Sequence, residues 1–368
     1  MKNKKIKILM ISASSKLGGG PIHMFMLGKN LKKDFEVYYA LPKSKNFLDN
    51  LPKNKFIFIK ERSIVIKDLL NIKRFIKQNK IDIIHAHGKG ASVLGRILKI
   101  FTRKPLVYTP HGIHVSCHKI FKRITYLIYE YLTGFLDTIK IFVSLSEKNY
   151  AYKLGILNKA NYKIINNGVD NRVLKSSQET IREFLQNNSN ISVKVISICR
   201  FVKQKNIKEI IEIARICETI DFYILGDGPL FNDIENLISN YQLKNISLVG
   251  KTKNVFKYLY SSDIFLSTSI YEGLPISVLE AMSIGLPVIA SKVTGNVDTI
   301  QHAFSGYFYQ LKDIYSASKY INILSKDKSL RLKMGKSAFT RQKKLFSTKK
   351  MIASYEVLYN EIIKKSDF

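Results

Sequence analysis

Short apolar runs alternate with amphipathic stretches along most of the chain. The apolar runs of the first part are rich in Ile, Val and Phe and have the length of buried strands. We expect strands at residues 6–11, 36–40, 55–59, 81–85, 106–109, 139–143 and 162–165. The spacing between them is helical, so the order strand, helix, strand predicts a parallel sheet with helices on both faces.

The pattern breaks after residue 170 and then starts again. Residues 174–190, LKSSQETIREFLQNNSN, are polar and rich in Asn and Ser, which indicates a linker and a leading helix. A second series of strands is expected at residues 193–198, 221–225, 246–249, 264–267 and 287–290. The chain therefore predicts two α/β domains joined near residue 180, followed by an amphipathic helix at residues 348–365 that packs on a domain surface.

One stretch near the end of the second series is the most informative chemically. It reads YEGLPISVLEAMSIGLPVIAS, with Glu272 in a loop and Glu280 on the helix that Pro275 opens. The N–H groups at the start of a helix attract phosphate oxygens, whereas carboxylates accept hydrogen bonds from sugar hydroxyls. The stretch therefore predicts a site for a polyhydroxylated phosphate ester. The alternative is that Glu272 caps the helix dipole and Glu280 is a solvated helix residue.

Two cations follow the first strand of the second series. The segment ICRFVKQKNI places Arg200 and Lys205 five positions apart on a turn that leaves the strand. Ligands of open α/β sheets bind beyond the carboxyl ends of strands, so these cations can neutralise a diphosphate. A solvated loop would show the same pattern. The segment LGDGP, with Gly226 and Gly228, closes the next strand and by itself indicates a turn.

A glycine-rich loop joins the first strand of the chain to a helix. It reads SSKLGGGPIH, and Gly18, Gly19 and Gly20 permit close approach of a ligand to the backbone. The spacing is not G-x-G-x-x-G and lacks an acidic partner downstream, so the loop gives only weak support to a dinucleotide site.

Histidines gather near two strand ends of the first domain. The segments DIIHAHG and YTPHGIH place at these ends His85, His87, His111 and His114. They could form a metal cluster, but such histidines are more often structural, and no carboxylate lies nearby in the sequence.

The longest of these motifs resembles a known one. The pattern of residues 269–290, S-x-x-E-G-L-P-x-x-x-L-E-A-M-x-x-G-x-P-V-I-A, resembles the donor-site signature of the family 4 retaining glycosyltransferases, which have the GT-B fold. The resemblance extends from Lys5 to about Tyr307. It implies two Rossmann-like, doubly wound parallel-sheet domains that face a central cleft. The acceptor-side domain would span residues 1–175 and the donor-binding domain residues 176–345. A C-terminal helix at residues 346–368 would cross back to the first domain.

The resemblance also implies roles for individual residues. Arg200 and Lys205 would stabilise the departing diphosphate, Glu272 would orient the donor sugar, and His111 would contact that sugar. Further donor contacts would come from Glu280 on the ribose and from Gly18, Gly19, Gly226, Gly228, Gly273, Leu274, Pro275 and Ile276. His87 and Asn167 would face the acceptor. The chain departs from the family at Cys199 and Asn206, where glycine is common, which bears on the conformation of that loop.

The charge of the chain bears on its partners. The 368 residues have a formal net charge of +32, of which residues 1–190 contribute +23 and residues 191–368 contribute +9. A uniform codon bias toward lysine would not load one half so heavily, so a polyanionic partner is indicated, either nucleic acid or an anionic membrane surface. Residues 119–135, KIFKRITYLIYEYLTGF, fit a helix in a membrane interface or a core helix with a charged end. Since no nucleic-acid-binding motif occurs, we expect the membrane surface and no nucleic acid.

Cysteine content and hydropathy indicate a compartment. Cys117, Cys199 and Cys217 are too few and too scattered for a disulfide framework or a metal site, which fits a reducing cytoplasm. No apolar run approaches the length of a spanning helix, and the start MKNKKIKILMISAS is expected to be a buried strand rather than a signal peptide. We expect a cytoplasmic protein that is peripheral at the inner face of the plasma membrane.

The resemblance favours a retaining glycosyltransferase. It would move a sugar from a nucleotide donor, by expectation a UDP-sugar, to a hydroxyl of a glycan or lipid-linked glycan in bacterial surface-polysaccharide or lipopolysaccharide synthesis. It would need no metal and no cofactor. Two alternatives are a noncatalytic basic protein that binds nucleic acid or an anionic membrane, and a nucleotide-sugar epimerase of similar architecture. The order of the motifs in the second domain favours the transferase.

Overall fold

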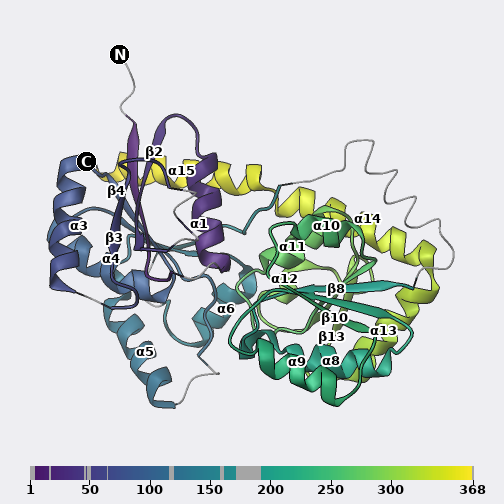
Figure 1. Ribbon diagram of the computed structural model, residues 1–368. Helices are drawn as coiled ribbons and strands as arrows, with labels where there is room; N and C mark the ends of the chain where they lie inside the picture. The colour runs from purple at the N-terminus through teal and green to yellow at the C-terminus, as the bar shows by residue number, and fades with distance from the viewer. Residues whose placement is uncertain are drawn as a thin grey trace. The chain divides into compact units, whose positions relative to one another are not determined.

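Two parallel sheets organise the chain, each flanked by helices (Figure 1). The computed structural model describes residues 5–15, 18–44, 47, 51–63, 65–115, 120–157, 161–170 and 192–366. It divides the chain into two compact units, residues 1–167 with 349–368, and residues 168–348. The domain boundary expected at residue 175, the expected linker and Cys117 lie outside the described residues.

The first unit is built on a seven-stranded sheet of order β3-β2-β1-β4-β5-β6-β7. Its strands are β1 (Ile6–Ser12), β2 (Phe35–Pro42), β3 (Phe56–Ile59), β4 (Ile83–His87), β5 (Leu106–Thr109), β6 (Ile139–Phe142) and β7 (Tyr162–Ile164). The flanking helices are α1 (Gly19–Asn30), α3 (Ile66–Asn79), α4 (Lys89–Thr102), α5 (Ile120–Thr133), η1 (Gly134–Leu136) and α6 (Leu145–Lys153). All strand pairs are parallel, and the strand order reverses at β1 and β4, where an open α/β sheet binds ligands.

The C-terminal helix α15 (Thr348–Ser366) packs on this first sheet. Tyr355 and Tyr359 are fully buried in one core with Ile8 and Met10 of β1. The opposite face of the sheet is covered by α3 and α4, through residues such as Ile72. The strands are thus buried on both sides, which explains why they are nearly continuous apolar runs.

The second unit has a six-stranded parallel sheet of order β10-β9-β8-β11-β12-β13. Its strands are β8 (Lys194–Ile198), β9 (Asp221–Leu225), β10 (Ile246–Gly250), β11 (Ile264–Ser267), β12 (Val288–Ser291) and β13 (Gly306–Tyr309). The flanking helices are η2 (Lys203–Lys205), α8 (Ile207–Ile216), α9 (Phe231–Asn240), α10 (Val255–Tyr260), α11 (Ile276–Ser283), α12 (Asn296–Thr299), α13 (Ile314–Lys326) and α14 (Lys328–Leu345). Here the strand order reverses between β8 and β11.

The structure confirms the predicted α/β class and most strand positions, with two differences. The strand expected at residues 81–85 runs instead from Ile83 to His87. Ile81 and Asp82 lie before it because the Ile81 N–H donates to the carbonyl of Ile76 and the Asp82 carboxylate accepts the Lys7 N–H. Strand β13 was not expected from the sequence. None of the described helices combines the length and apolar character needed to cross a bilayer.

Candidate functional site

The carboxyl ends of β8 and β11 bring together the cation and the carboxylate that the sequence predicts. Lys205 ends the short helix η2 after β8, and Glu272 lies in the loop after β11. Lys205 Nζ lies 2.5 Å from Glu272 Oε1, and the Ser269 hydroxyl donates to the same oxygen at 2.6 Å. The pair is largely buried, with side-chain exposures of 17% for Lys205 and 8% for Glu272. The two loops therefore form one charged site at the switch point of the sheet.

The second carboxylate oxygen of Glu272 is much less engaged. It contacts the Gln204 amide, whose Nε2 lies 3.5 Å from Oε2, and that amide donates a shorter bond of 2.9 Å to the Tyr271 carbonyl. Oε2 is thus the oxygen of Glu272 that can accept a hydrogen bond from a ligand hydroxyl.

The backbone around Glu272 is fixed by its neighbours. The Glu272 N–H donates to the carbonyl of Thr294 at 2.9 Å. Gly295 has φ +84°, and a Cβ at this position would lie 2.7 Å from the Cβ of Glu272. The Ser291 hydroxyl donates to the carbonyl of Ser269 at 2.6 Å and ties the end of β12 to the same loop. These contacts hold the carboxylate with little freedom.

Arg200 lies in the same loop as Lys205 but is exposed to solvent. Within the part of the chain that the structure describes, no ion pair of Arg200 is present. The loop that holds it lies directly against the loop after β9, because the Phe201 N–H donates to the carbonyl of Asp227 at 3.0 Å. The loop backbone is thus held in place while the Arg200 guanidinium is open to solvent, where it can bind a ligand phosphate.

The two glycines after β9 permit this close approach of the loops. Gly226 has φ +133°, and a Cβ there would collide with the carbonyl oxygen of Cys199. A Cβ on Gly228 would lie 2.7 Å from the carbonyl oxygen of Phe201. The segment with Gly226 and Gly228, which the sequence by itself indicates only as a turn, therefore packs against the loop of Arg200.

The helix α11 begins at Ile276, and Pro275 is its N-cap residue. Gly273, Leu274, Pro275 and Ile276 are buried, and no acidic residue lies in the first turn. Glu280, the fifth residue of the helix, is partly exposed. The first turn of α11 thus adds no negative charge of its own, which suits an anionic ligand.

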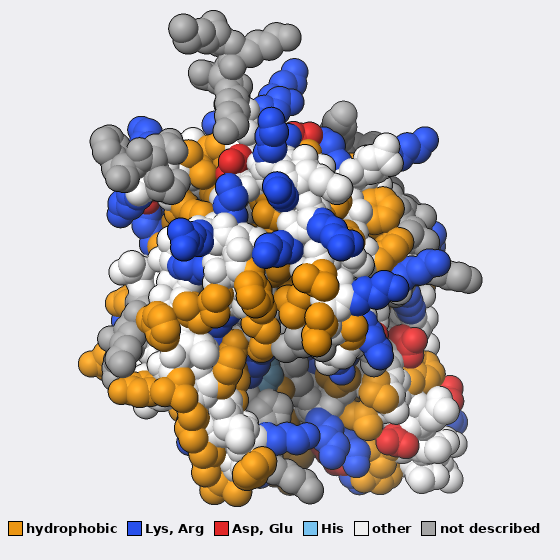
Figure 2. Space-filling view, turned by 90° about the vertical axis from the view of Figure 1, so that its left-hand side faces the viewer, with side chains coloured by type: hydrophobic (Ala, Val, Ile, Leu, Met, Phe, Trp, Pro, Cys, Tyr) orange, Lys and Arg blue, Asp and Glu red, His pale blue; other side chains and the backbone are white. Residues whose placement is uncertain are grey.

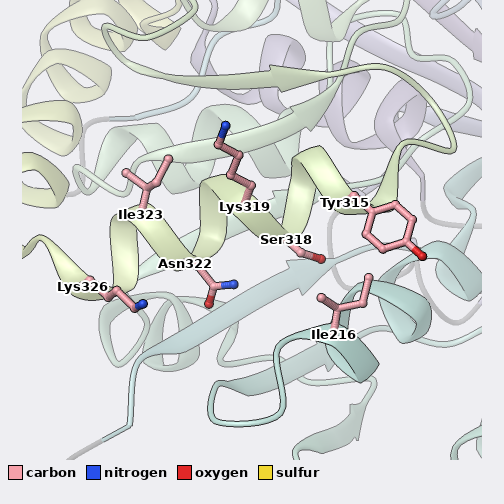
Figure 3. Close-up of a pocket in the computed structure, with 7 residues that line it drawn as sticks. All are labelled: Ile216, Tyr315, Ser318, Lys319, Asn322, Ile323 and Lys326. Atoms are coloured by element: carbon pink, nitrogen blue, oxygen red, sulfur yellow. The ribbon is translucent and has the colours of Figure 1, made fainter.

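A hollow at these strand ends is lined by the ends of β8 and β11, the segments that follow them and the first turn of α11. Its lining includes Cys199, Lys205, Thr268, Ser269 and Ser277. The described residues that line this hollow do not include Arg200 or Glu280. A separate hollow lies along α13 and the last residue of α8, lined by Ile216, Tyr315, Ser318, Lys319, Asn322, Ile323 and Lys326 (Figure 3). It contains none of the predicted site residues.

In the first unit, three buried histidines and the partly buried His111 meet at the ends of β4 and β5. His87 ends β4, and His111 follows β5 with φ +59°. His87 Nδ1 and His111 Nε2 lie 3.0 Å apart, within hydrogen-bond distance. The ring centroid of His23, on α1, lies 4.8 Å from that of His111, and the ring centroids of His85 and His87 lie 3.9 Å apart.

The partners of these histidines differ. Both nitrogens of His85 are engaged, Nδ1 with the Tyr359 hydroxyl at 2.7 Å and Nε2 with the Thr109 hydroxyl at 2.8 Å, so His85 is structural. His23 Nδ1 lies 2.9 Å from Asn167 Oδ1. The Nε2 atoms of His23 and His87 have no hydrogen-bond partner among the described residues. Asn167, which the sequence predicts at the acceptor side, is therefore a partner of His23. His23 itself was not predicted from the sequence.

Burial keeps this histidine group neutral. Burial lowers the pKa of His23 to about 4, opposed in part by its bond to Asn167. It also lowers the pKa values of His85, His87 and His111 well below the ordinary value, with a smaller contribution from the neighbouring histidines. Neutral imidazoles both donate and accept hydrogen bonds, so the group suits the recognition of hydroxyls.

The same neutral nitrogens could hold a metal ion. One ligand atom each from His23, His87 and His111 all lie within 4.8 Å of one another. The contact of 3.0 Å between His87 Nδ1 and His111 Nε2 also fits a hydrogen bond between two neutral rings, which needs no ion. His114, the remaining predicted histidine, is not in the group; its carbonyl lies 3.3 Å from Lys89 Nζ.

Glu147 of α6 holds the turn that carries His111. Its carboxylate accepts the Gly112 N–H at 2.6 Å and the Val143 N–H at 2.9 Å. Burial raises the pKa of Glu147 to about 7, although the backbone N–H groups oppose that rise. The sequence contains a signal for this residue, since Ser144 and Glu147 have the S-x-x-E spacing of a capping box. In the structure the Ser144 hydroxyl accepts the Glu147 N–H.

The glycine-rich loop lies beside His111. A Cβ on Gly20 would lie 3.2 Å from His111 Cδ2. Gly18 is the N-cap of α1, with extended backbone, and Gly19 begins the helix with no atom within 4 Å of where its Cβ would be. The predicted loop and the predicted sugar-contact histidine therefore belong to one site in the first unit.

Comparisons with known proteins agree with this architecture. The family model described as Glycosyltransferase Family 4 matches residues 17–172, and the model described as Glycosyl transferases group 1 matches residues 177–341. The UDP-Gal:alpha-D-GlcNAc-diphosphoundecaprenol alpha-1,3-galactosyltransferase of Escherichia coli is 28% identical over 316 residues, which cover 81% of this chain and 80% of that protein. The Staphylococcus aureus capsular polysaccharide biosynthesis glycosyltransferase CapM is 23% identical over 385 residues, which cover 100% of each chain.

Solved structures show the same fold at lower identity. The crystal structure of Anabaena HepE in complex with UDP-glucose aligns with a TM-score of 0.81 and 18% identity over 96% of this chain and 100% of that one. Sucrose-phosphate synthase from Thermosynechococcus elongatus aligns with a TM-score of 0.84 over 98% and 100%. With family models matching both units in order, the chain belongs to the family 4 glycosyltransferases of the GT-B fold.

Proposed function

We propose that this glycosyltransferase moves a sugar, with retention of configuration, from a UDP-sugar to a hydroxyl of a lipid-linked glycan. The observation that carries the proposal is the buried pair of Lys205 and Glu272 at the switch point of the second sheet. A cation and a carboxylate side by side match the two ends of a nucleotide sugar, the diphosphate and the hydroxyl-rich sugar.

The diphosphate would be held by the two cations of the β8 loop. Lys205 is positioned by Glu272, and Arg200 is exposed nearby in sequence, with no acidic partner in the described residues to compete with a phosphate. As the bond from the sugar to the diphosphate breaks, negative charge grows on the leaving oxygen, and fixed cations stabilise it. The acceptor oxygen forms its bond on the same face of the sugar, and its proton passes to an oxygen of the departing diphosphate.

The sugar and ribose would be held by the carboxylates. Glu272 Oε2, whose contact with Gln204 is long, would accept a bond from a donor-sugar hydroxyl. Glu280 of α11 would accept bonds from the ribose hydroxyls, and the start of that helix, at Gly273, Leu274, Pro275 and Ile276, would receive phosphate oxygens. In the first unit, His111 would contact the sugar, beside the loop of Gly18 and Gly19, while His87 and Asn167 would serve the acceptor side.

The choice of donor and acceptor follows the relatives. The Escherichia coli relative is named for UDP-Gal and for an acceptor carried on diphosphoundecaprenol. A Campylobacter jejuni relative, 31% identical over 190 residues, is also named for a diphospho-undecaprenol acceptor. We therefore propose a UDP-sugar and a lipid-linked acceptor of surface-polysaccharide synthesis, with the protein at the cytoplasmic face of the membrane. The family makes the nucleic-acid-binding and epimerase alternatives unnecessary.

We propose that transfer needs no metal ion. The cations Arg200 and Lys205 supply the charge that a divalent ion would supply to a diphosphate, and His87 and His111 hydrogen-bond to each other. Treatment with EDTA should leave the rate of UDP release unchanged. A loss of rate that zinc or manganese restores would instead assign the histidine group to a metal.

The direct test is product analysis. The purified protein is incubated with UDP-glucose, UDP-galactose and their N-acetyl derivatives, together with a bacterial lipid extract, and the linkage is determined by NMR. We expect one donor to be consumed and an α-linked product to form, and the variant Glu280→Ala to need more donor for the same rate. A β-linked product, or the absence of transfer from any UDP-sugar, would contradict the proposal.

A further inference from the structure

Helix α5 presents an apolar face to solvent. Seven large hydrophobic side chains in and just after the helix are between 48% and 75% exposed, namely Ile120, Phe121, Ile124, Ile128, Tyr131, Leu132 and Phe135. At 100° per residue the six of them within the helix fall within about 120° of the helix circumference, with no charged residue between them. A soluble surface helix normally places such a stripe toward the core.

The inward face of α5 carries a buried carboxylate instead. Glu130, the one acidic residue of the helix, is 1% exposed and lies 3.0 Å from Arg96 Nη2 and 2.8 Å from Lys140 Nζ. Asp137 completes the group, at 2.7 Å from Arg96. Two cations and two anions are thus paired inside the unit.

This buried ionic group fixes the orientation of the helix. Rotation of α5 to bury its apolar stripe would remove Glu130 from Arg96 and Lys140 and leave buried charges unpaired, which is strongly unfavourable. The outward apolar stripe is therefore a stable feature of the fold, and its exposure calls for an apolar partner.

The neighbouring helices extend the surface and add positive charge. Ile66 and Leu70 of α3 and Ile100 and Phe101 of α4 are also at least half exposed. Exposed basic residues of α3 lie among them, namely Lys67, Lys73, Arg74 and Lys77. Lys73 Nζ lies 5.6 Å from the ring centroid of Phe101, so charge and apolar surface are in contact. Figure 2 shows this side of the molecule, with a band of hydrophobic side chains bordered by Lys and Arg.

We infer that the α3–α4–α5 face docks on an anionic lipid bilayer, with the apolar stripe of α5 inserted shallowly among the headgroups. Apolar side chains bordered by lysine and arginine match a surface that is apolar below and negatively charged above. Lysine is depleted from protein–protein interfaces, which makes a protein partner a poorer match. The docking surface stands on its own contacts, whereas its use in catalysis rests on the proposed lipid-linked acceptor.

The test is co-sedimentation of the full chain with lipid vesicles. The wild type is compared with Phe121→Ser/Ile128→Ser and with the control Phe304→Ser/Tyr315→Ser, whose residues are similarly exposed, at 56% and 75%, in the second unit. Vesicles are phosphatidylcholine alone or mixed with phosphatidylglycerol. We expect binding to the mixed vesicles, weaker at high salt, a loss of about tenfold or more in the α5 variant, and none in the control.

Two results would overturn the inference. One is a wild type that does not sediment with the mixed vesicles, or an α5 variant that binds them as the wild type does. The other is a wild-type dimer that the α5 substitutions convert to monomer without vesicle binding, which would assign the face to a second copy. Stabilisation by UDP is measured in parallel, so that failure of docking and failure of the donor site are distinguished.

Discussion

At the scale of single residues, a few contacts of Glu272 make up the centre of the donor site. The two carboxylate oxygens of Glu272 have different partners. One contacts Lys205 and Ser269, and the other has a long contact with Gln204. The sequence identified Lys205 and Glu272 through their motifs, but it did not show that they touch. A contact between residues 67 positions apart depends on the strand order, which single-residue spacing does not contain.

Lys205 gives the clearest prediction at this scale. Lys205→Ala should lower kcat by about 10²- to 10³-fold, because the charge on the leaving diphosphate loses a fixed cation. Arg200→Ala should act in the same direction. The matched control is Lys203→Ala, which removes an exposed lysine of the same short helix. Steady-state kinetics with the consumed donor measure the effect, and turnover of Lys205→Ala within a few-fold of Lys203→Ala would refute the assigned role.

The buried histidines predict how stability depends on pH. His23 has a folded pKa of about 4, and an unfolded histidine titrates near about 6.5, so between these values the unfolded chain binds more protons. Stability should therefore be lost as the pH falls through this range, by about 1.4 kcal/mol per pH unit for each such histidine. Glu147 acts in the opposite direction, because its raised pKa favours the folded state as the pH falls below about 7. Burial raises the pKa values of Asp137 and Glu209 as well, and we expect the four histidines to outweigh these carboxyl groups.

Thermal unfolding measured between about pH 7 and pH 5 tests the sign of this effect. We expect the unfolding temperature of the wild type to fall toward pH 5 and to fall less steeply in His23→Gln, which removes one of the titrating groups. Stability that rises toward pH 5, or an unchanged slope in the variant, would show that these histidines are not held neutral.

At the scale of elements, hydrophobic pattern predicted most of the strands, and tertiary contacts decided the rest. The strand ending at His87 is displaced from its expected position because Asp82 bonds the Lys7 backbone, a contact over 75 positions. The stripe of α5 fitted either a core helix or an interfacial one. The structure exposes the stripe, because Glu130 of the same helix is buried against Arg96 and Lys140, which no local pattern reveals.

The loop after β9 gives a prediction at this scale. Gly226→Ala should destabilise the protein by roughly 2 kcal/mol or more, because its Cβ would collide with the Cys199 carbonyl and its φ is unfavourable for other residues. Binding of UDP should weaken as well, since the displaced loop carries Arg200. Gly250→Ala is the control, because Gly250 also has positive φ, +74°, but nothing lies within 4 Å of the added Cβ.

Urea denaturation of both variants measures the difference. The control should lose only about 1 kcal/mol, the conformational cost of a positive φ. Equal losses in the two variants would mean that the packing of the β9 loop against Cys199 does not support the site.

At the scale of the whole molecule, two units of the same architecture carry different chemistry. The second has the cations and carboxylates expected for a nucleotide sugar, and the first has a neutral histidine group and an apolar, basic outer face. The uneven charge of the sequence indicated a polyanionic partner for the first part of the chain. Only the structure placed the apolar stripe of α5 next to that charge.

Thermal stability titrated with UDP and with GDP, for the wild type, Lys205→Ala and Lys203→Ala, reports directly on the donor site. A ligand present at about 100 times its dissociation constant stabilises a protein by about 2.7 kcal/mol, which is easily resolved. We predict saturable stabilisation by UDP in the wild type and in Lys203→Ala, and a weaker effect in Lys205→Ala. If neither nucleotide stabilises the wild type, or if Lys205→Ala responds as the wild type does, the donor site is not where this account places it.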